Sequence, residues 1–363
     1  MRSKLRRILP LMWWFKQHNS PLTSMMQYHY IAHVKKTPKR VSVLTGSAWV
    51  HELLVGNDDR FEEVARMPKH VFKALVKELL EHGQLKPTHT VSANEQVAMY
   101  LYFAGHHASS ANLQERFQHS GDTITRHLHR VQNAILQLAA TYIQLPPDNA
   151  PLPRRVRDSR KFFPFFANCR MAVDGTHIPV SVPTKDVKAY QGRKGFTQNV
   201  LAACDFNMVF TYVLAGWEGS AGDGRIYADA LEKGQKPRTK EELFNLRHAM
   251  LRNVVERIFG VLKKRFPVMS SPVEYSIGFQ VDMVLSLCTV HNFIRLHGCT
   301  NDIYVQEATR ELRARNNEPM QPNDQPQHHP DLETTEAKAW RDQLATDMWE
   351  QYQVHCNRRH ARR

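Results

Sequence analysis

The stretch "MAVDGTHIPV", residues 171–180, places one aspartate, Asp174, in an otherwise apolar and β-branched run. Strand interiors disfavour Asp, and a buried carboxylate is costly unless a hydrogen-bond donor or a cation lies beside it. The partner of Asp174 could be an arginine, the amide of a turn or a metal ion. The residues around Asp174 leave all three open, so the partner must be sought elsewhere in the chain.

Short β-branched or aromatic runs follow Asp174 and predict strands. They are "HIPVSVP", "TQNVLAACD" and "MVFTYVLAGW", which lie between residues 177 and 217 and are separated by turn residues. Two helical patterns come next, "EELFNLRHAMLRNVVERIFGVLKKRF" (241–266) and "VDMVLSLCTVHNFIRLHG" (281–298). The order of strands followed by helices marks residues 166–300 as one domain.

The first half of the chain has a helical pattern over residues 41–145. Within it, "HSGDTITRHLHRVQNAIL" (119–136) follows two shorter helical stretches and has a turn before a new helix near Asp122. This order resembles a helix-turn-helix in which Thr125, Arg126 and His129 face the DNA groove, with Arg126 and Arg130 as DNA contacts. An ordinary helical bundle with a basic polar face explains the same spacing.

Three further segments complete the organisation. Residues 1–40 are basic and irregular, and we expect a flexible arm. A Pro-rich stretch predicts a linker over residues 146–165. Residues 301–363 are expected to be a partly disordered tail that ends in a helix, because Asn, Gln, Pro and His dominate 315–335.

The chain is strongly basic, with 49 Lys and Arg against 35 acidic residues and a net charge of +14. Such a surplus is typical of proteins that bind a polyanion, although it also aids solubility. Residues 233–265 alone hold ten Lys or Arg against three Glu. The candidate DNA contacts outside the helical half are Arg193, Lys194, Arg252, Arg257, Lys263 and Lys264. Arg193 and Lys194 are equally explained as a solvated turn between two strands.

Membrane and disulfide signals are weak. No run approaches the roughly 20 apolar residues that a membrane span needs, and the short patch "ILPLMWWF" does not resemble a signal peptide. The five cysteines are scattered and show no CxxC pairing, which favours a reducing compartment over a disulfide framework or a structural zinc site.

Two other acids have positions suited to a shared metal site with Asp174. Carboxylates that hold metal ions for phosphoryl transfer need a rigid strand, a neighbouring strand end and a packed helix. Asp223 follows the turn "GWEGSAGD" (216–223), and Glu256 lies off the apolar stripe of the 241–266 helix. Alternatively, Asp223 is a helix N-cap, and Glu256 forms an i,i+4 pair with Arg252 on a solvated face.

Taken together, four stretches resemble the PIF/Harbinger transposases and their domesticated nuclease relatives. They are "VDGTHI", "AYQGRKGFTQNVLAACD", "GWEGSAGD" and "LFNLRHAMLRNVVERIFGVLKKRF". The resemblance implies an RNase H-like DDE catalytic domain, within an α/β fold, that cleaves DNA with a divalent cation, Mg²⁺ or Mn²⁺. It implies Asp174, Asp223 and Glu256 as the catalytic, metal-binding acids. It also implies a nuclear protein and a Myb-like DNA-binding partner protein.

The chain departs from the family pattern between the second and third acids. Family members carry a long segment there, with a further strand and a further aspartate. Here only 32 residues separate Asp223 from Glu256, and none of them forms a strand-like run. The sequence therefore predicts a truncated sheet. A metal-dependent endonuclease and a catalytically dead, transposase-derived DNA-binding protein both remain open, with a protein-interaction scaffold as a third class.

Overall fold

The computed structural model describes residues 13, 21–35, 38–147, 149–183, 187–192, 195–218, 239–298, 302–315 and 334–360. The chain divides into two compact units, Met1–Leu44 and Thr45–Arg363. The first unit contains helix α2 (Pro21–His29), which continues directly into the π-helix η1 (Tyr30–Val34). Part of the arm expected to be irregular is therefore helical.

Six helices open the second unit, and they correspond to the helical half predicted from the sequence. They are α3 (Gly46–Val55), α4 (Asp58–Ala65), α5 (Lys69–Glu81), α6 (Ala93–His106), α7 (Ser110–Phe117) and α8 (Gly121–Tyr142). Ser92 caps α6, since its hydroxyl accepts a hydrogen bond from the amide of Glu95. Ser120 caps α8 in the same way, which confirms the turn before that helix.

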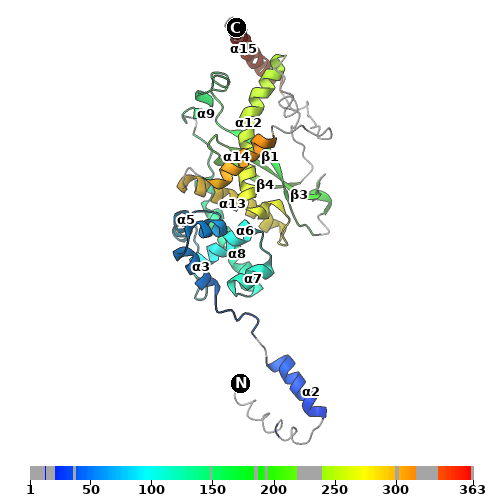
Figure 1. Cartoon of the computed structure of the whole chain (residues 1–363). Helices are drawn as coiled ribbons and strands as arrows, with labels where there is room; N and C mark the ends of the chain where they lie inside the picture. The colour runs from blue at the N-terminus through cyan, green and yellow to red at the C-terminus, as the bar shows by residue number, and fades with distance from the viewer. Residues whose placement is uncertain are drawn as a thin grey trace. The chain divides into compact units, whose positions relative to one another are not determined.

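A small antiparallel sheet follows, with β3 as its central strand (Figure 1). Its strands are β1 (Ala172–Pro179), β2 (Gln191–Gly192), β3 (Gly195–Cys204) and β4 (Phe210–Glu218), with the one-turn helix α10 (Val187–Tyr190) before β2. β1 and β4 pair with opposite edges of β3, and Asp174 lies opposite Ala202. The strands predicted at 197–205 and 208–217 are confirmed as β3 and β4, whereas only residues 177–179 of the predicted run 177–183 belong to a strand, β1.

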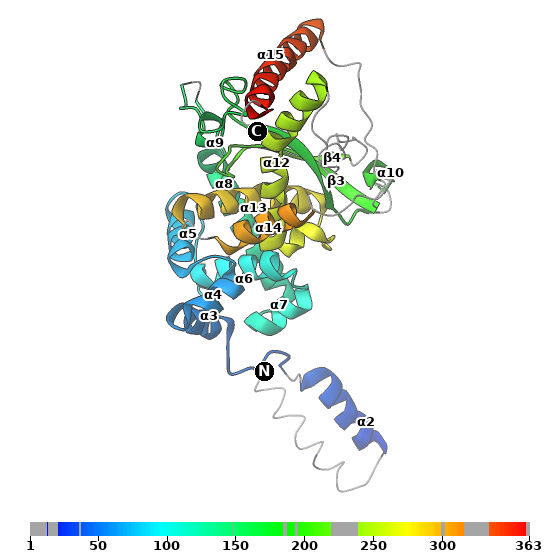
Figure 2. The same ribbon diagram turned by 45° about the horizontal axis from the view of Figure 1, so that its top comes forward.

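The remaining helices surround this sheet and extend the unit. They are α9 (Arg154–Arg157), α12 (Lys240–Arg265), the 3₁₀-helix η2 (Pro267–Ser270), α13 (Ile277–His297), α14 (Ile303–Arg315) and α15 (Thr335–His360). In both ribbon views α12 runs between the sheet and the α9 segment (Figures 1 and 2). α12 is therefore the element that joins the two sides of this region.

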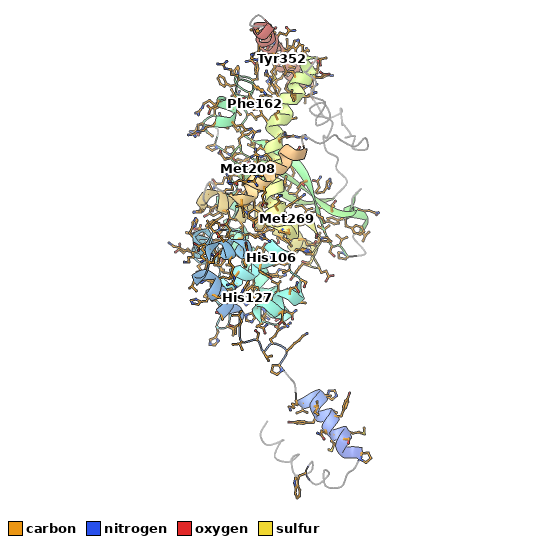
Figure 3. All side chains as sticks on the ribbon, in the orientation of Figure 1. His106, His127, Phe162, Met208, Met269 and Tyr352 are labelled. Atoms are coloured by element: carbon orange, nitrogen blue, oxygen red, sulfur yellow. The ribbon has the colours of Figure 1, made fainter. Side chains whose placement is uncertain are left out.

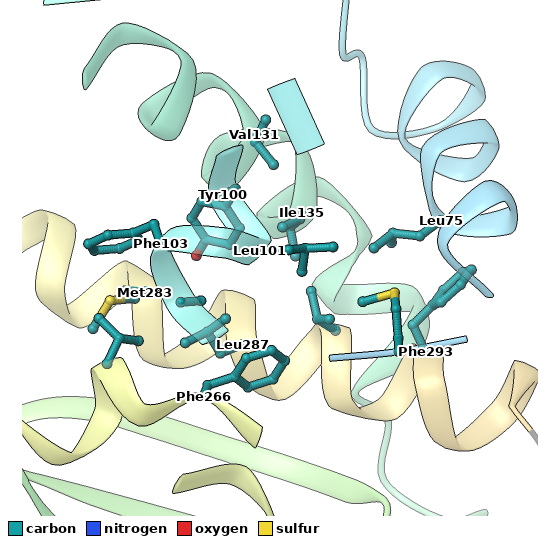
Figure 4. Close-up of a cluster of buried hydrophobic side chains, with 14 of the residues drawn as sticks. Leu75, Tyr100, Leu101, Phe103, Val131, Ile135, Phe266, Met283, Leu287 and Phe293 are labelled. Atoms are coloured by element: carbon teal, nitrogen blue, oxygen red, sulfur yellow. The ribbon is translucent and has the colours of Figure 1, made fainter. Parts of the chain in front are cut away.

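One hydrophobic core joins the helical half to the strand-and-helix half. Figure 4 shows Leu75, Tyr100 and Ile135 from the N-terminal helices beside Leu287 and Phe293 of α13. Polar contacts cross the same boundary. The Gln132 side-chain amide donates to the carbonyl of Phe279 at 3.2 Å, and that of Asn292 donates to the carbonyl of Tyr142 at 2.8 Å. The boundary predicted near residue 146 therefore lies inside a single compact unit.

A second apolar cluster involves the segment expected to be a linker. Val156 and Phe162 are buried there against the first half of α12 and against α15. Figure 3 labels two of its members, Phe162 and Tyr352. Residues 156–162 are thus packed structure, and the expectation of a linker over 146–165 is wrong for them. The Pro-rich composition predicts an irregular backbone correctly but does not show what the intervening apolar side chains contact.

Helix α13 is long and apolar enough to cross a membrane by length and composition, with a mean hydropathy of 1.3 over its best window. The sequence prediction concerned a run of roughly 20 apolar residues, and α13 is not such a run, because polar residues such as Gln280, Asp282 and Asn292 interrupt it. Among the described residues, α13 is one helix that meets this criterion, and 72% of its apolar window is buried inside the protein. It packs on α8 and β4, as a core helix does.

Candidate metal centre and nucleic-acid interface

The strand β1 presents alternate side chains to α12, because successive residues of a strand point to opposite faces. Ala172 and Ile178 are buried on the same face as Asp174 and Thr176, whereas Val173 on the other face is 49% exposed. α12 packs across β1. The sequence period of β1 therefore directs the Asp174 carboxylate toward that helix.

Arg252 of α12 lies between the two acids that the sequence assigns to a metal site. Its Nε is 3.7 Å from Asp174 Oδ2, and its Nη2 is 3.7 Å from Glu256 Oε1. The amide of Gly175 also donates to Asp174 Oδ1 at 3.0 Å. Side-chain exposure rises from 14% for Asp174 to 24% for Arg252 and 45% for Glu256. The cluster therefore opens from the sheet toward solvent.

The partner of Asp174 is not a single group. The Asp174 carboxylate contacts both an arginine and the amide of the next residue, and the i,i+4 pair expected between Arg252 and Glu256 is present. The two carboxylates lie on either side of one positive group. Carboxylate oxygens are the donors that Mg²⁺ and Mn²⁺ prefer, so these two residues are of the chemical type that can hold a divalent metal.

The rest of the predicted metal site lies outside the described residues. Asp223 falls in the stretch 219–238, so the structure brings together two of the three predicted acids. Among the residues that are described, no group of three or more His, Cys, Asp and Glu side chains is arranged to hold a metal. Arg193 and Lys194 also lie outside the description, between β2 and the start of β3.

Three other basic residues of α12 expected to contact DNA make contacts within the protein. Lys263 Nζ donates to the Thr176 hydroxyl of β1 at 3.0 Å. Lys264 Nζ lies 3.7 Å from Glu307 Oε2 on α14. Arg257 of α12 donates to the hydroxyl of Thr309 on α14 at 3.4 Å. Much of the positive charge of α12 therefore fixes the helix on β1 and α14.

The helix-turn-helix candidate differs from expectation on its predicted DNA-facing side. Thr125 hydrogen-bonds the Tyr275 side chain. The ring of His129 packs edge-on at 4.6 Å from the Phe279 ring. These two residues, expected to face a groove, instead lie against residues of the strand-and-helix half. Arg126 and Arg130 are exposed, and Arg126 forms an ion pair with Asp122.

A second basic surface was not predicted from the sequence. The run "RRVRDSRK", residues 154–161, exposes Arg154, Arg157, Arg160 and Lys161. Buried Val156 anchors this run to the apolar cluster. Arg155 fixes it to α12 by donating to the carbonyl of Met250 at 2.9 Å. We refer to residues 154–161 as the basic segment. Five basic residues in eight were a visible signal, which the linker interpretation obscured.

Known proteins resemble both halves of the chain. The model of the DDE superfamily endonuclease family matches residues 173–231 and 227–292, and a family described only as a domain of unknown function matches residues 41–137. The human and bovine proteins named "Putative nuclease HARBI1" are each 22% identical over 277 residues, which cover 66% of this chain and 79% of theirs. "Protein ALP1-like" of Arabidopsis thaliana is 23% identical over 191 residues, covering 48% of this chain and 46% of its own.

No solved structure matches the chain. The endonuclease match begins at the strand that carries Asp174 and ends within α13, so it includes β1 and α12 and the contact between them. The matched relatives support the Harbinger-type resemblance seen in the sequence. Residues 173–231 and 227–292 of this chain are therefore similar to the DDE superfamily endonuclease family.

Proposed function

We propose that this protein is a transposase-derived DNA endonuclease whose divalent metal is held by Asp174, Asp223 and Glu256. The observation that carries the proposal is the convergence of Asp174 of β1 and Glu256 of α12 on one positive group. A bound Mg²⁺ or Mn²⁺ would stabilise charge on the phosphate and activate the attacking water. The endonuclease domain and the HARBI1 relatives support this reaction class.

We also propose an RNase H-like core that lacks one strand. Three consecutive antiparallel strands with α12 on one face support this fold. The family model matches in two pieces, 173–231 and 227–292, which supports a missing segment between Asp223 and Glu256. Loss of an acid there would weaken metal binding, since two-ion catalysis uses several carboxylates. We therefore expect feeble cleavage, and a catalytically dead DNA-binding protein is the second candidate function.

DNA binding would rest on exposed basic residues rather than on α12. Arg126 and Arg130 of α8 and the basic segment are exposed, while the basic residues of α12 described above contact the protein. Phosphate contacts of this kind survive the loss of catalysis, because they need only positive charge. We further propose a nuclear location and a Myb-like partner protein, on the family resemblance alone.

The test is thermal unfolding of wild type and Asp174→Asn, each with and without Mn²⁺. In the substituted protein Arg252 keeps Glu256 as a partner, so we expect the metal-free protein to lose about 1 kcal/mol or less. The rise in Tm that Mn²⁺ gives the wild type should disappear. Asp205→Asn is the matched control. Asp205 closes the turn after β3, and the side-chain oxygen of the new asparagine can still accept the hydrogen bonds that backbone amides donate to Asp205.

Cleavage is measured on supercoiled plasmid in the same preparations. A wild type that binds DNA but shows neither metal stabilisation nor nicking would contradict the endonuclease and favour the DNA-binding protein. A metal response retained in Asp174→Asn would remove Asp174 from the ligand set.

A further inference from the structure

We propose that Arg252 is a positioning residue that serves as the resident counter-ion of the metal site and competes with the metal for its ligands. The proposal rests on the proposed function, because it takes Asp174 and Glu256 as metal ligands. It adds that the metal-free site is held by the chain's own cation. Metal binding then requires the guanidinium to leave both carboxylates.

The position of Arg252 supports this role. Asp174 comes from β1 and Glu256 from α12, and the guanidinium reaches an oxygen of each at the same distance, 3.7 Å. Both contacts are longer than a direct hydrogen bond, which for N⁺–H···O⁻ is about 2.7–2.9 Å. These two contacts therefore place the positive charge beside both acids at more than direct hydrogen-bond distance.

Exposure distinguishes Arg252 from two of the three other arginines of α12. Arg247 and Arg265 are 6% and 1% exposed, and both are held in the interior. The Arg252 side chain is 24% exposed and lies beside the still more open Glu256. A long, half-open side chain can move aside into water at low cost. Arg252 therefore has a route out of the site that the other two lack.

Charge explains why the site needs such a residue. Two carboxylates near one another repel when no cation lies between them, and a guanidinium stays charged at any pH at which proteins fold. Arg252 can be removed from the site only by movement, not by loss of a proton. A divalent cation offers the same acids twice the charge in a smaller volume. Metal and arginine are therefore alternative occupants of the space between Asp174 and Glu256.

The experiment compares wild type, Arg252→Gln and Arg252→Lys without metal and across a Mn²⁺ titration followed by calorimetry. Without metal, Arg252→Gln should unfold a few degrees lower, because the acids lose their counter-ion. Its Mn²⁺ midpoint should fall about tenfold, because one competitor is gone. Arg252→Lys keeps the positive charge but loses the two-pronged guanidinium that reaches both acids. The unfolding temperature and the Mn²⁺ midpoint should therefore change in the same directions as in Arg252→Gln, but by less.

A double-mutant cycle of Arg252→Gln with Glu256→Gln in metal-free protein tests the counter-ion separately. Arg252→Gln should cost less when Glu256 is already neutral. Additive effects in that cycle, or a Mn²⁺ midpoint that is unchanged or raised in Arg252→Gln, would overturn the proposal. If Arg252→Gln fails to fold, the midpoint of Arg252→Lys decides it.

Failure of the proposed function has a different signature. A wild type without any Mn²⁺ response removes the metal site, and with it the competition. The metal-free cycle would then report only whether Arg252 pairs with Glu256. The competition itself stands only if the wild type binds Mn²⁺ and Arg252→Gln binds it more tightly.

Discussion

Helix α12 carries two arginines paired with acids, one in its middle and one at its C-terminal end, and the two arrangements differ in almost every physical respect. In the middle of the helix, Arg252 lies 3.7 Å from two carboxylates and is a quarter exposed. Thirteen residues later, Arg265 pairs closely with Asp302, and their side chains are 1% and 8% exposed. The first arrangement is open and shared between two acids, whereas the second is closed and exclusive to one.

The surroundings explain the difference. Arg265 stacks on the ring of Tyr304 at 5.0 Å, and the Tyr304 hydroxyl accepts from Arg66, whose Nε donates to the carbonyl of Gly105. This network ties α14 to the N-terminal helices. Arg252 makes contacts besides those with its two acids, and its side chain is 24% exposed. A closed pair fixes the fold, and an open pair leaves its acids available to another cation.

The largest effect should come from breaking the closed pair. Arg265→Met leaves the Asp302 carboxylate buried without its cation, and stranded buried charges cost about 3–5 kcal/mol. At a few degrees per kcal/mol, Tm should fall by roughly 10 °C. Arg252→Met should cost much less, since both of its partners reach water. Differential scanning calorimetry of both variants measures the contrast.

The double variant Arg265→Met/Asp302→Asn is the control for this prediction. It removes the stranded charge but leaves an oxygen that can accept from the amide of Tyr304, as Asp302 does at 3.1 Å. We expect it to recover most of the lost stability. Equal losses of stability in Arg252→Met and Arg265→Met would contradict the distinction between the open and the closed pair.

A second prediction uses pH to sharpen the contrast at the closed end. Burial, assisted by the positive charge of Arg265, lowers the pKa of His291 to about 3. The imidazole is neutral in the folded protein and has a pKa near 6.5 when unfolded, so the unfolded chain binds the extra proton first. His291 therefore contributes stability above pH 6.5, and this is lost as pH falls from 6.5 toward 3.

His291→Gln should flatten this part of the stability curve. While only the unfolded form of His291 is protonated, the loss approaches about 1.4 kcal/mol per pH unit. Gln keeps a donor for the carbonyl of Met208, which His291 contacts at 3.0 Å. Urea unfolding between pH 7 and 4.5 measures the slope, with His82→Gln as a surface control. An unchanged slope in His291→Gln would mean that other groups carry the acid sensitivity.

The local elements around the site could be predicted from sequence, but their partners could not. Strand β1 and helix α12 have strong periodicities, and the pairing of Arg252 with Glu256 follows from i,i+4 spacing. The contact between Arg252 and Asp174 depends on how α12 crosses β1, which spacing does not encode. The same limit explains Thr125, whose polar side chain suggested a groove contact but hydrogen-bonds Tyr275.

The packed linker was missed for a related physical reason. Prolines predict an irregular backbone, but an irregular segment can still bury side chains such as Val156 and Phe162 if a distant helix covers them. The covering helix, α15, comes almost 180 residues later in the chain. The sequence predicts that α15 is a helix. It does not show that this helix covers residues 156–162, because that contact exists only in the folded chain.

The smallest expected effect concerns which residues contact DNA if Arg252 and Arg265 of α12 use their charges within the protein. We predict that Arg160→Ala/Lys161→Ala weakens binding to duplex DNA about tenfold at low salt and lowers the slope of log K against log[salt] by about 2, one unit per lost phosphate contact. Lys73→Ala/Lys77→Ala removes the same charge from the exposed side of α5 and is the matched control.

Fluorescence anisotropy across a salt series separates this from a general charge effect. If only net charge matters, both double variants should shift binding equally, because both carry two positive charges fewer. If the basic segment makes the contacts, only Arg160→Ala/Lys161→Ala should change the slope. Arg126→Ala/Arg130→Ala, measured alongside, tests α8 in the same terms. A salt slope that changes only in Arg126→Ala/Arg130→Ala would assign the phosphate contacts to the helix-turn-helix candidate. The basic segment would then have only a structural role.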